Sequence, residues 1–135
     1  MEIWRRGVAV GRRLCRVADC LEERRQYRFA EQLRAAALSI SNNIAEGSGA
    51  FSNRDFANFI AIAHKSTYEC ASMLLFFCED GLIEKNLIED LLDELNQQTK
   101  MQFVFRKRLL QQSPNTPVIK EDAGIYDFSQ SSQLD

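Results

Sequence analysis

The chain has 135 residues, of which 45% are hydrophobic and 27% charged, and a formal net charge of −2 at pH 7. This composition is typical of one globular domain and excludes a disordered chain. With six glycines and only two prolines, Pro114 and Pro117, it disfavours a turn-rich all-β fold. A single histidine, His64, excludes a histidine-rich metal site.

The compartment is predicted from the N-terminal residues, the apolar runs and the cysteines. The opening Met-Glu-Ile-Trp-Arg-Arg lacks the apolar segment of a secretory signal, and the longest apolar run, residues 73–78, is too short to span a bilayer. We therefore expect a cytoplasmic protein that does not enter a membrane. No Cys-x-x-Cys spacing occurs, so we expect no metal or cofactor, and buried free thiols at Cys15, Cys20, Cys70 and Cys78.

Two helices are predicted in the first half of the chain. In residues 2–23, apolar positions recur at steps of three and four: Trp4, Val8, Gly11, Cys15 and Ala18, with Leu14 and Leu21 beside them. Residues 28–46 form the second helix, with an inner face of Leu33, Ala37, Ile40 and Ile44. It ends at residues 47–49, Gly-Ser-Gly, where we expect a glycine in the left-handed conformation.

The third helix has the clearest start signal. Ser52 is the expected N-cap, and Asp55 three residues later completes a capping box. Phe51 and Phe56 fit a hydrophobic staple across this start. The apolar stripe that follows ends at Gly81 and comprises Phe56, Phe59, Ile60, Ala63, Cys70, Leu74 and Phe77.

A fourth helix is predicted over residues 84–112, with an inner face of Ile88, Leu91, Leu95, Phe105 and Leu109. Four long amphipathic helices with short connections predict an all-α, up-down-up-down antiparallel four-helix bundle over residues 1–112. Residues 113–135 contain both prolines and a Ser/Gln-rich end, and we expect them to form a flexible C-terminal tail. Tyr126 and Phe128 offer that tail a means of docking on a partner, and a frayed terminus is the simpler alternative.

The small net charge conceals an uneven distribution. Residues 1–34 carry nine arginines and five acids, residues 79–94 seven acids and one lysine, and residues 95–112 four bases and no acid. The topology places the start of the first helix and the end of the fourth at one pole. The expected basic pole, with no exposed aromatics interleaved, is a possible contact for RNA or DNA and comprises Arg5, Arg12, Arg16, Arg106, Lys107 and Arg108. The alternatives are a solvated surface and a contact with an acidic surface of another subunit.

A polar stripe lies beside the apolar face of the second predicted helix. Gln32, Ser39, Asn43 and Glu46 fall within about 60° of one another at 100° per residue, and Ser66 and Glu69 form a polar pair on the third helix. Glu46 and Glu69 together would suit acid–base chemistry or a hard metal, but the topology separates them. We therefore favour a hydrogen-bond network between helices or subunits, with Glu46 also holding the turn that follows.

The stretch from Ala37 to Gly49, A-L-S-I-S-N-N-I-A-E-G-S-G, resembles the S-I-P-x-N-I-A-E-G-x-G signature of the 23S rRNA-intervening sequence proteins. Glu2-Ile3-Trp4 is similar to the L-x-V-W opening of that family, Gln32-Leu33-Arg34 to Q-I-R-R-A, and the segment 59–69 to F-L-x-I-A-x-G-S-x-x-E. The proline of the signature is replaced by Ser41, and a glycine of the last motif by Lys65.

This resemblance implies a bacterial four-helix bundle that assembles as a homopentamer and has no established enzymatic activity. A related protein is the accessory factor of a reverse transcriptase and binds nucleic acid through a basic surface. The resemblance implies structural or interface roles, and no catalytic role, for the motif residues Gln32, Ser39, Asn43, Ile44, Ala45, Glu46, Gly47, Ser66 and Glu69.

Overall fold

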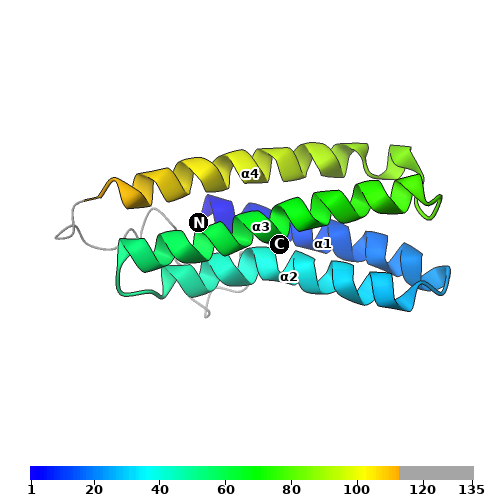
Figure 1. Cartoon of the computed structure of the whole chain (residues 1–135), viewed down its shortest axis with the longest axis horizontal. Coiled ribbons are helices and arrows are strands. Elements are labelled where there is room, and N and C mark those ends of the chain that lie inside the picture. Colours follow the sequence, from blue (N-terminus) through cyan, green and yellow to red (C-terminus); the bar gives the residue numbers. More distant parts are fainter. Residues whose placement is uncertain (113–135) are drawn as a thin grey trace.

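The computed structural model describes residues 1–112, which form an antiparallel up-down-up-down bundle of four α-helices (Figure 1). The all-α bundle predicted from the sequence is confirmed. The tail predicted over residues 113–135 lies outside the described residues. The helices are α1 (Glu2–Glu23), α2 (Tyr27–Ser48), α3 (Asn53–Glu79) and α4 (Glu89–Leu110), with a short 3₁₀ helix, η1 (Lys85–Leu87), before α4.

The face that α1 buries differs from the predicted stripe by a small rotation. Trp4, Val8, Gly11 and Cys15 are only partly buried and lie at the edge of the core. Most of the buried residues follow alternating steps of four and three, the spacing that keeps one seam of a helix against its neighbours: Ile3, Gly7, Val10, Leu14, Val17 and Leu21. The predicted residue Ala18 is also buried. The apolar surface of α1 is therefore broader than one stripe.

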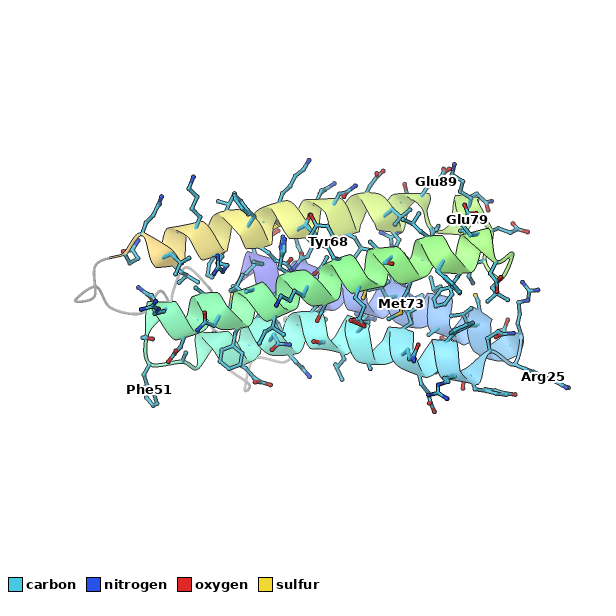
Figure 2. All side chains as sticks on the ribbon, in the orientation of Figure 1. Arg25, Phe51, Tyr68, Met73, Glu79 and Glu89 are labelled. Atoms are coloured by element: carbon cyan, nitrogen blue, oxygen red, sulfur yellow. The ribbon has the colours of Figure 1, made fainter. Side chains whose placement is uncertain are left out.

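The start of α3 confirms the predicted cap and contradicts the predicted staple. The Ser52 hydroxyl accepts a hydrogen bond from the Asp55 backbone N–H at 3.1 Å. Phe56 is fully buried, but Phe51 is 97% exposed and points away from the bundle (Figure 2). Phe51 and Phe56 therefore do not clamp the helix start, which depends on the hydroxyl cap.

The end of α2 does not use a left-handed glycine. The helix continues through Gly47 and Ser48, and the following Gly49 has φ −85°. Left-handed backbone occurs instead at Gly81, with φ 72°, just after α3, as expected of a helix-terminating glycine, and at Arg25, with φ 62°, between α1 and α2.

The predicted start of the fourth helix is also corrected. The chain makes the 3₁₀ turn η1 before α4 begins at Glu89, and this turn lies between two buried residues, Ile83 and Ile88. The predicted inner residues Leu91, Leu95 and Leu109 are buried, and Phe105 is partly buried. Between Leu95 and Phe105, however, the core positions of α4 are occupied by two glutamines that the sequence analysis did not single out.

These glutamines, Gln98 and Gln102, are 1% and 0% exposed. The Gln98 side-chain amide donates to the Ile3 carbonyl oxygen at 3.1 Å, which ties α4 to the first turn of α1. Gln102 donates to the Thr67 hydroxyl at 2.9 Å, and Thr67 donates in turn to the Ala63 carbonyl at 2.8 Å. Polar contacts therefore fix the position of α4 against both α1 and α3.

Candidate interaction groove between helices α2 and α3

Four of the polar residues predicted from the sequence line one open groove between α2 and α3. Gln32 and Ser39 come from α2, and Ser66 and Glu69 from α3. The groove has a volume of about 440 Å³, and its remaining walls are Ala35, Ala36 and Met73. Figure 2 shows Met73 on the side of α3 that faces α2. These seven residues are called the polar groove below.

A short hydrogen-bond network forms the floor of the polar groove. The hydroxyl oxygens of Ser39 and Ser66 are 2.8 Å apart and join the two helices. The Asn43 side-chain amide donates to the Ser39 hydroxyl at 2.9 Å and to the Ser39 carbonyl at 2.8 Å. Because the hydroxyl pair has two protons and its mutual hydrogen bond uses one, a second hydroxyl proton remains as a donor. The predicted network between helices is thus present only in part: it joins Ser39, Asn43 and Ser66. Glu46 contributes its backbone carbonyl, and not its side chain, to the turn that follows α2.

The mouth of the polar groove carries an amide and a carboxylate. Gln32 and Glu69 are both exposed, and within residues 1–112 neither forms an ion pair or a hydrogen bond with another side chain of the bundle. The carboxylate of Glu69 accepts hydrogen bonds, whereas the Gln32 amide and the hydroxyls of the floor can both donate and accept them. The polar groove therefore offers donors, acceptors and one negative charge to a ligand.

The motif residues Ile44, Ala45, Glu46 and Gly47 do not line the polar groove. Ile44 is buried in the core, and the Ala45 carbonyl accepts from the Ser48 hydroxyl at 2.7 Å. The Glu46 side chain is exposed and does not line the polar groove, so the structure keeps Glu46 and Glu69 apart as the topology predicted. Gly47 is buried where α2 meets α3: a Cβ at Gly47 would lie 2.7 Å from Phe56 Cδ1 and 2.8 Å from Phe59 Cβ.

The predicted basic residues do not all meet at one end. The last turns of α4 hold Arg106, Lys107 and Arg108, and Arg108 lines a cavity of about 400 Å³ together with Glu2 and Ile3 at the start of α1. Arg5 belongs to this same end of α1. Arg16 instead lines a cavity with Leu87 and Leu91, where α4 begins, so the expected single basic pole is wrong for Arg16. Arg12 is exposed and lies between Arg5 and Arg16 along α1.

The opposite end of the bundle carries the acidic stretch predicted from the sequence, together with arginines from the α1–α2 turn. Figure 2 shows Glu79, Glu89 and Arg25 at this end. The Arg24 guanidinium donates to the backbone carbonyls of Gly81 and Leu82 at 2.8 and 2.9 Å, which fastens the α1–α2 turn to the α3–α4 connection. The acidic charge is therefore partly offset by arginines.

The cysteines are free thiols, but only Cys70 is fully buried. Cys15 and Cys78 are partly buried, and Cys20 is exposed, which corrects the expectation of four buried thiols. Burial raises the pKa of the Cys70 thiol to about 12, with a smaller contribution from the nearby Glu69 carboxylate. Because the reactive species is the thiolate, burial and this pKa both protect Cys70.

We therefore expect a thiol reagent at pH 8 to label Cys20 first in the folded protein and to leave Cys70 unlabelled until the protein is denatured. The raised pKa favours the neutral thiol in the folded state, so its stabilising effect is complete below the unfolded-state pKa, near 9, and is lost as the pH rises toward 12. Mass spectrometry of digested, alkylated protein measures this order. Labelling of Cys70 as fast as Cys20 at pH 8 would contradict the burial of α3 against the core.

Residues 1–112 therefore define an antiparallel four-helix bundle protein with a polar groove between two adjacent helices. Within this part of the chain no helix has the length and hydropathy that crossing a bilayer requires, and no three histidine, cysteine or acidic side chains are grouped as metal ligands.

The model of the 23S rRNA-intervening sequence protein family matches residues 1–103, and the chain belongs to this family. The match confirms the resemblance seen in the N-I-A-E-G segment. It covers α1, α2, α3 and most of α4, so it includes every residue of the polar groove. Comparisons with the curated proteins and with the solved structures found no match.

Proposed function

We propose that this protein is a non-enzymatic bacterial interaction module that assembles as a homo-oligomer, with a pentamer as the expected state, in the cytoplasm. The observation that carries the proposal is the number of large apolar side chains left uncovered on the outer faces of the helices. Those that are at least 45% exposed include Leu38 on α2, Ile62, Tyr68, Leu75 and Phe76 on α3, and Phe103, Val104 and Leu110 on α4.

Single exposed apolar residues are normal on soluble proteins, but several on one helix indicate a surface that another molecule covers. Four of these side chains lie on α3 alone, and three lie within the last eight residues of α4. Further copies of the same chain are the natural partners, because soluble assemblies are most often homo-oligomers. The pentamer, the bacterial origin and the absence of catalysis rest on the family resemblance.

Light scattering coupled to size-exclusion chromatography tests the assembly. The chain has a mass of 15.5 kDa, so a pentamer is expected near five times 15.5 kDa, which is about 78 kDa. A single species of 15.5 kDa at micromolar concentration would exclude the homo-oligomer. A stable assembly of another size would keep the oligomer and correct its number of subunits.

Contact with RNA or DNA is the second candidate function. It is favoured by the basic last turns of α4 (Arg106, Lys107 and Arg108) and by Phe103, which is 64% exposed beside them. The sequence predicted no exposed aromatic side chain among these basic residues, and Phe103 corrects that prediction. Arginine and lysine bind phosphates, and an aromatic ring stacks on bases, the combination used for single strands.

This second function predicts a salt-sensitive retention of single-stranded RNA or DNA that is insensitive to sequence. Replacing Lys107 and Arg108 by glutamate is expected to reduce binding at low salt by about tenfold or more. The matched control replaces two exposed basic residues at the opposite end of the bundle, Arg25 and Lys85, by glutamate. Equal losses in both double variants would indicate a nonspecific effect of net charge, and no loss in either would remove the α4 surface as a contact.

A further inference from the structure

A cavity of about 400 Å³ lies between the start of α1 and the last turns of α4 and is called the α1–α4 cavity below. Its apolar members are Ile3 from α1, and Met101, Val104 and Phe105 from α4. Its charged members are Glu2, Lys100 and Arg108. Val104 is 63% exposed, so this apolar surface is open to a ligand. A mostly apolar cavity of this size with a few charged groups is the usual form of a ligand-binding site.

The charges of the α1–α4 cavity favour an acidic occupant. Lys100 is exposed, and none of the ion pairs among residues 1–112 includes it. Residues 95–112 carry four basic residues and no acid, so the single carboxylate of the cavity, Glu2, is outnumbered. We therefore expect an occupant that has both apolar side chains and carboxylates.

The same chain contains a segment with this chemistry beyond the described residues. Residues 113–135 carry four acids and one lysine, a net charge of −3. Within them, residues 125–128 read Ile-Tyr-Asp-Phe, so three large apolar side chains and a carboxylate fall within four positions. The family model ends at residue 103 and does not account for this segment.

The segment begins next to the α1–α4 cavity. Arg108 is two residues before Leu110, the last residue of α4, and Lys100 is ten residues before it, about 15 Å along the helix at 1.5 Å per residue. Twelve residues, 113–124, connect the described bundle to Ile125 and can span up to about 40 Å. A short connection within one chain gives an effective concentration of millimolar order, which favours this segment over a separate peptide.

Two other surfaces of the described bundle fit the segment less well. The polar groove carries the Glu69 carboxylate, which repels acids. The cavity beside Leu87 and Leu91 contains arginines, but it lies where α4 begins, next to the seven acids of residues 79–94. Of the three, the α1–α4 cavity combines apolar members, a cation without an ion pair among residues 1–112, and nearness to residue 113.

We propose that Tyr126 and Phe128 of the same chain bind in the α1–α4 cavity, with Asp127 beside Lys100. Both partners belong to one chain, so the proposal does not depend on the homo-oligomer. Docked there, the segment covers Arg108 and therefore part of the basic surface that the second candidate function assigns to RNA or DNA.

Photocross-linking of the full chain tests the contact. A benzophenone side chain replaces Tyr126 and, on illumination, inserts into C–H bonds within its reach. Trypsin cleaves after Lys100 and Arg106, so residues 101–106 form one peptide that holds the three apolar members from α4. We expect this peptide to be the main one that mass spectrometry finds joined to residues 121–135. The same benzophenone in place of Phe51, which is 97% exposed, is the control and is expected to join residues 101–106 at least about fivefold less often.

Lys100→Glu tests the contribution of charge. It places a carboxylate opposite the acids of the segment and is expected to lower the cross-linking yield from position 126 by about twofold or more, as for an exposed ion pair. The variant lacks the trypsin site at residue 100, so its product carries residues 86–106. Arg25→Glu makes the same charge change at the opposite end of the bundle and is expected to leave the yield unchanged. Circular dichroism of each variant confirms that the helices are retained.

A denaturing gel separates docking within one chain from docking between copies. A cross-linked product of 15.5 kDa supports the proposal, whereas a covalent dimer at twice 15.5 kDa, about 31 kDa, would assign the cavity to the segment of a second copy and overturn the contact within one chain. Cross-links from position 126 that are absent, or that spread over the bundle like those from position 51, would overturn the cavity as the site. An equal yield in Lys100→Glu and Arg25→Glu would overturn the pairing of Asp127 with Lys100.

Discussion

Replacing Gly47 by alanine is expected to lower the free energy of unfolding by about 1–3 kcal/mol, the usual cost of forcing extra atoms into a packed core. The added Cβ would lie 2.7 Å from Phe56 Cδ1 and 2.8 Å from Phe59 Cβ, both inside van der Waals contact. Phe56 is fully buried, and Phe59 Cβ is fixed to the backbone of α3 and cannot rotate away, so α2 and α3 must separate. Urea unfolding followed by circular dichroism measures the loss.

Two other glycines serve as controls for Gly47→Ala. Gly49 has φ −85° and meets only the Glu46 carbonyl at 3.4 Å, so alanine there is expected to be neutral or slightly stabilising. Gly81 lies in open space but has φ 72°, and alanine there is expected to cost about 1–2 kcal/mol through backbone strain alone. If Gly47→Ala and Gly49→Ala unfold at the same urea concentration, the close approach of α2 and α3 at Gly47 is wrong.

The largest loss of stability is expected from Phe56→Ala, at about 3–5 kcal/mol, because it removes a fully buried ring and leaves a cavity. The ring packs under Gly47 and stands 5.3 Å, centroid to centroid, from the ring of Phe105 on α4. Phe51→Ala is the matched control, since Phe51 is 97% exposed and its loss is expected to change stability by less than about 0.5 kcal/mol. A similar loss in the free energy of unfolding in both variants would indicate that Phe51 and Phe56 do form a hydrophobic staple, contrary to the structure.

A double variant connects these two predictions. In the Phe56→Ala background the space beside Gly47 is partly empty, so Gly47→Ala is expected to cost less than it does alone. The contact with Phe59 Cβ at 2.8 Å remains, and some of the cost therefore persists. Strict additivity of the two losses would show that Phe56 is not what restricts residue 47.

The helices were predictable because apolar spacing and capping are local properties of the sequence. The bounds of α1 and the Ser52 cap follow from the residues themselves. Side-chain direction at the helix ends is not local: Phe51 fits a staple by spacing, yet the α2–α3 turn points it into solvent. Gln98 and Gln102 were not predicted as core residues because an apolar stripe does not include polar side chains, although they follow Leu95 by three and seven residues, the spacing of the buried face.

The polar groove was only half predictable. The sequence places Gln32 and Ser39 on one face of α2, and Ser66 and Glu69 one turn apart on α3. It does not give the axial register of the two helices, that is, which residue of α2 lies opposite which residue of α3. The length of the α2–α3 turn and the close contact at Gly47 set this register and bring Ser39 opposite Ser66. Arg16 was misplaced for another reason: it follows Arg5 by eleven residues, and at 1.5 Å per residue this puts it about 16 Å farther along α1, toward the other end of the bundle.

The two buried glutamines have a consequence for the homo-oligomer proposed above. In such an assembly, helices of like sequence are held at high local concentration, and a purely apolar α4 can pair with the wrong neighbour or slip by seven residues. Slippage of α4 by one heptad separates the Gln98 amide from the Ile3 carbonyl and the Gln102 amide from Thr67, and buries polar atoms without partners. We therefore expect these glutamines to disfavour the exchange of α4 between subunits, as a buried polar residue specifies the register and the oligomeric state of a coiled coil.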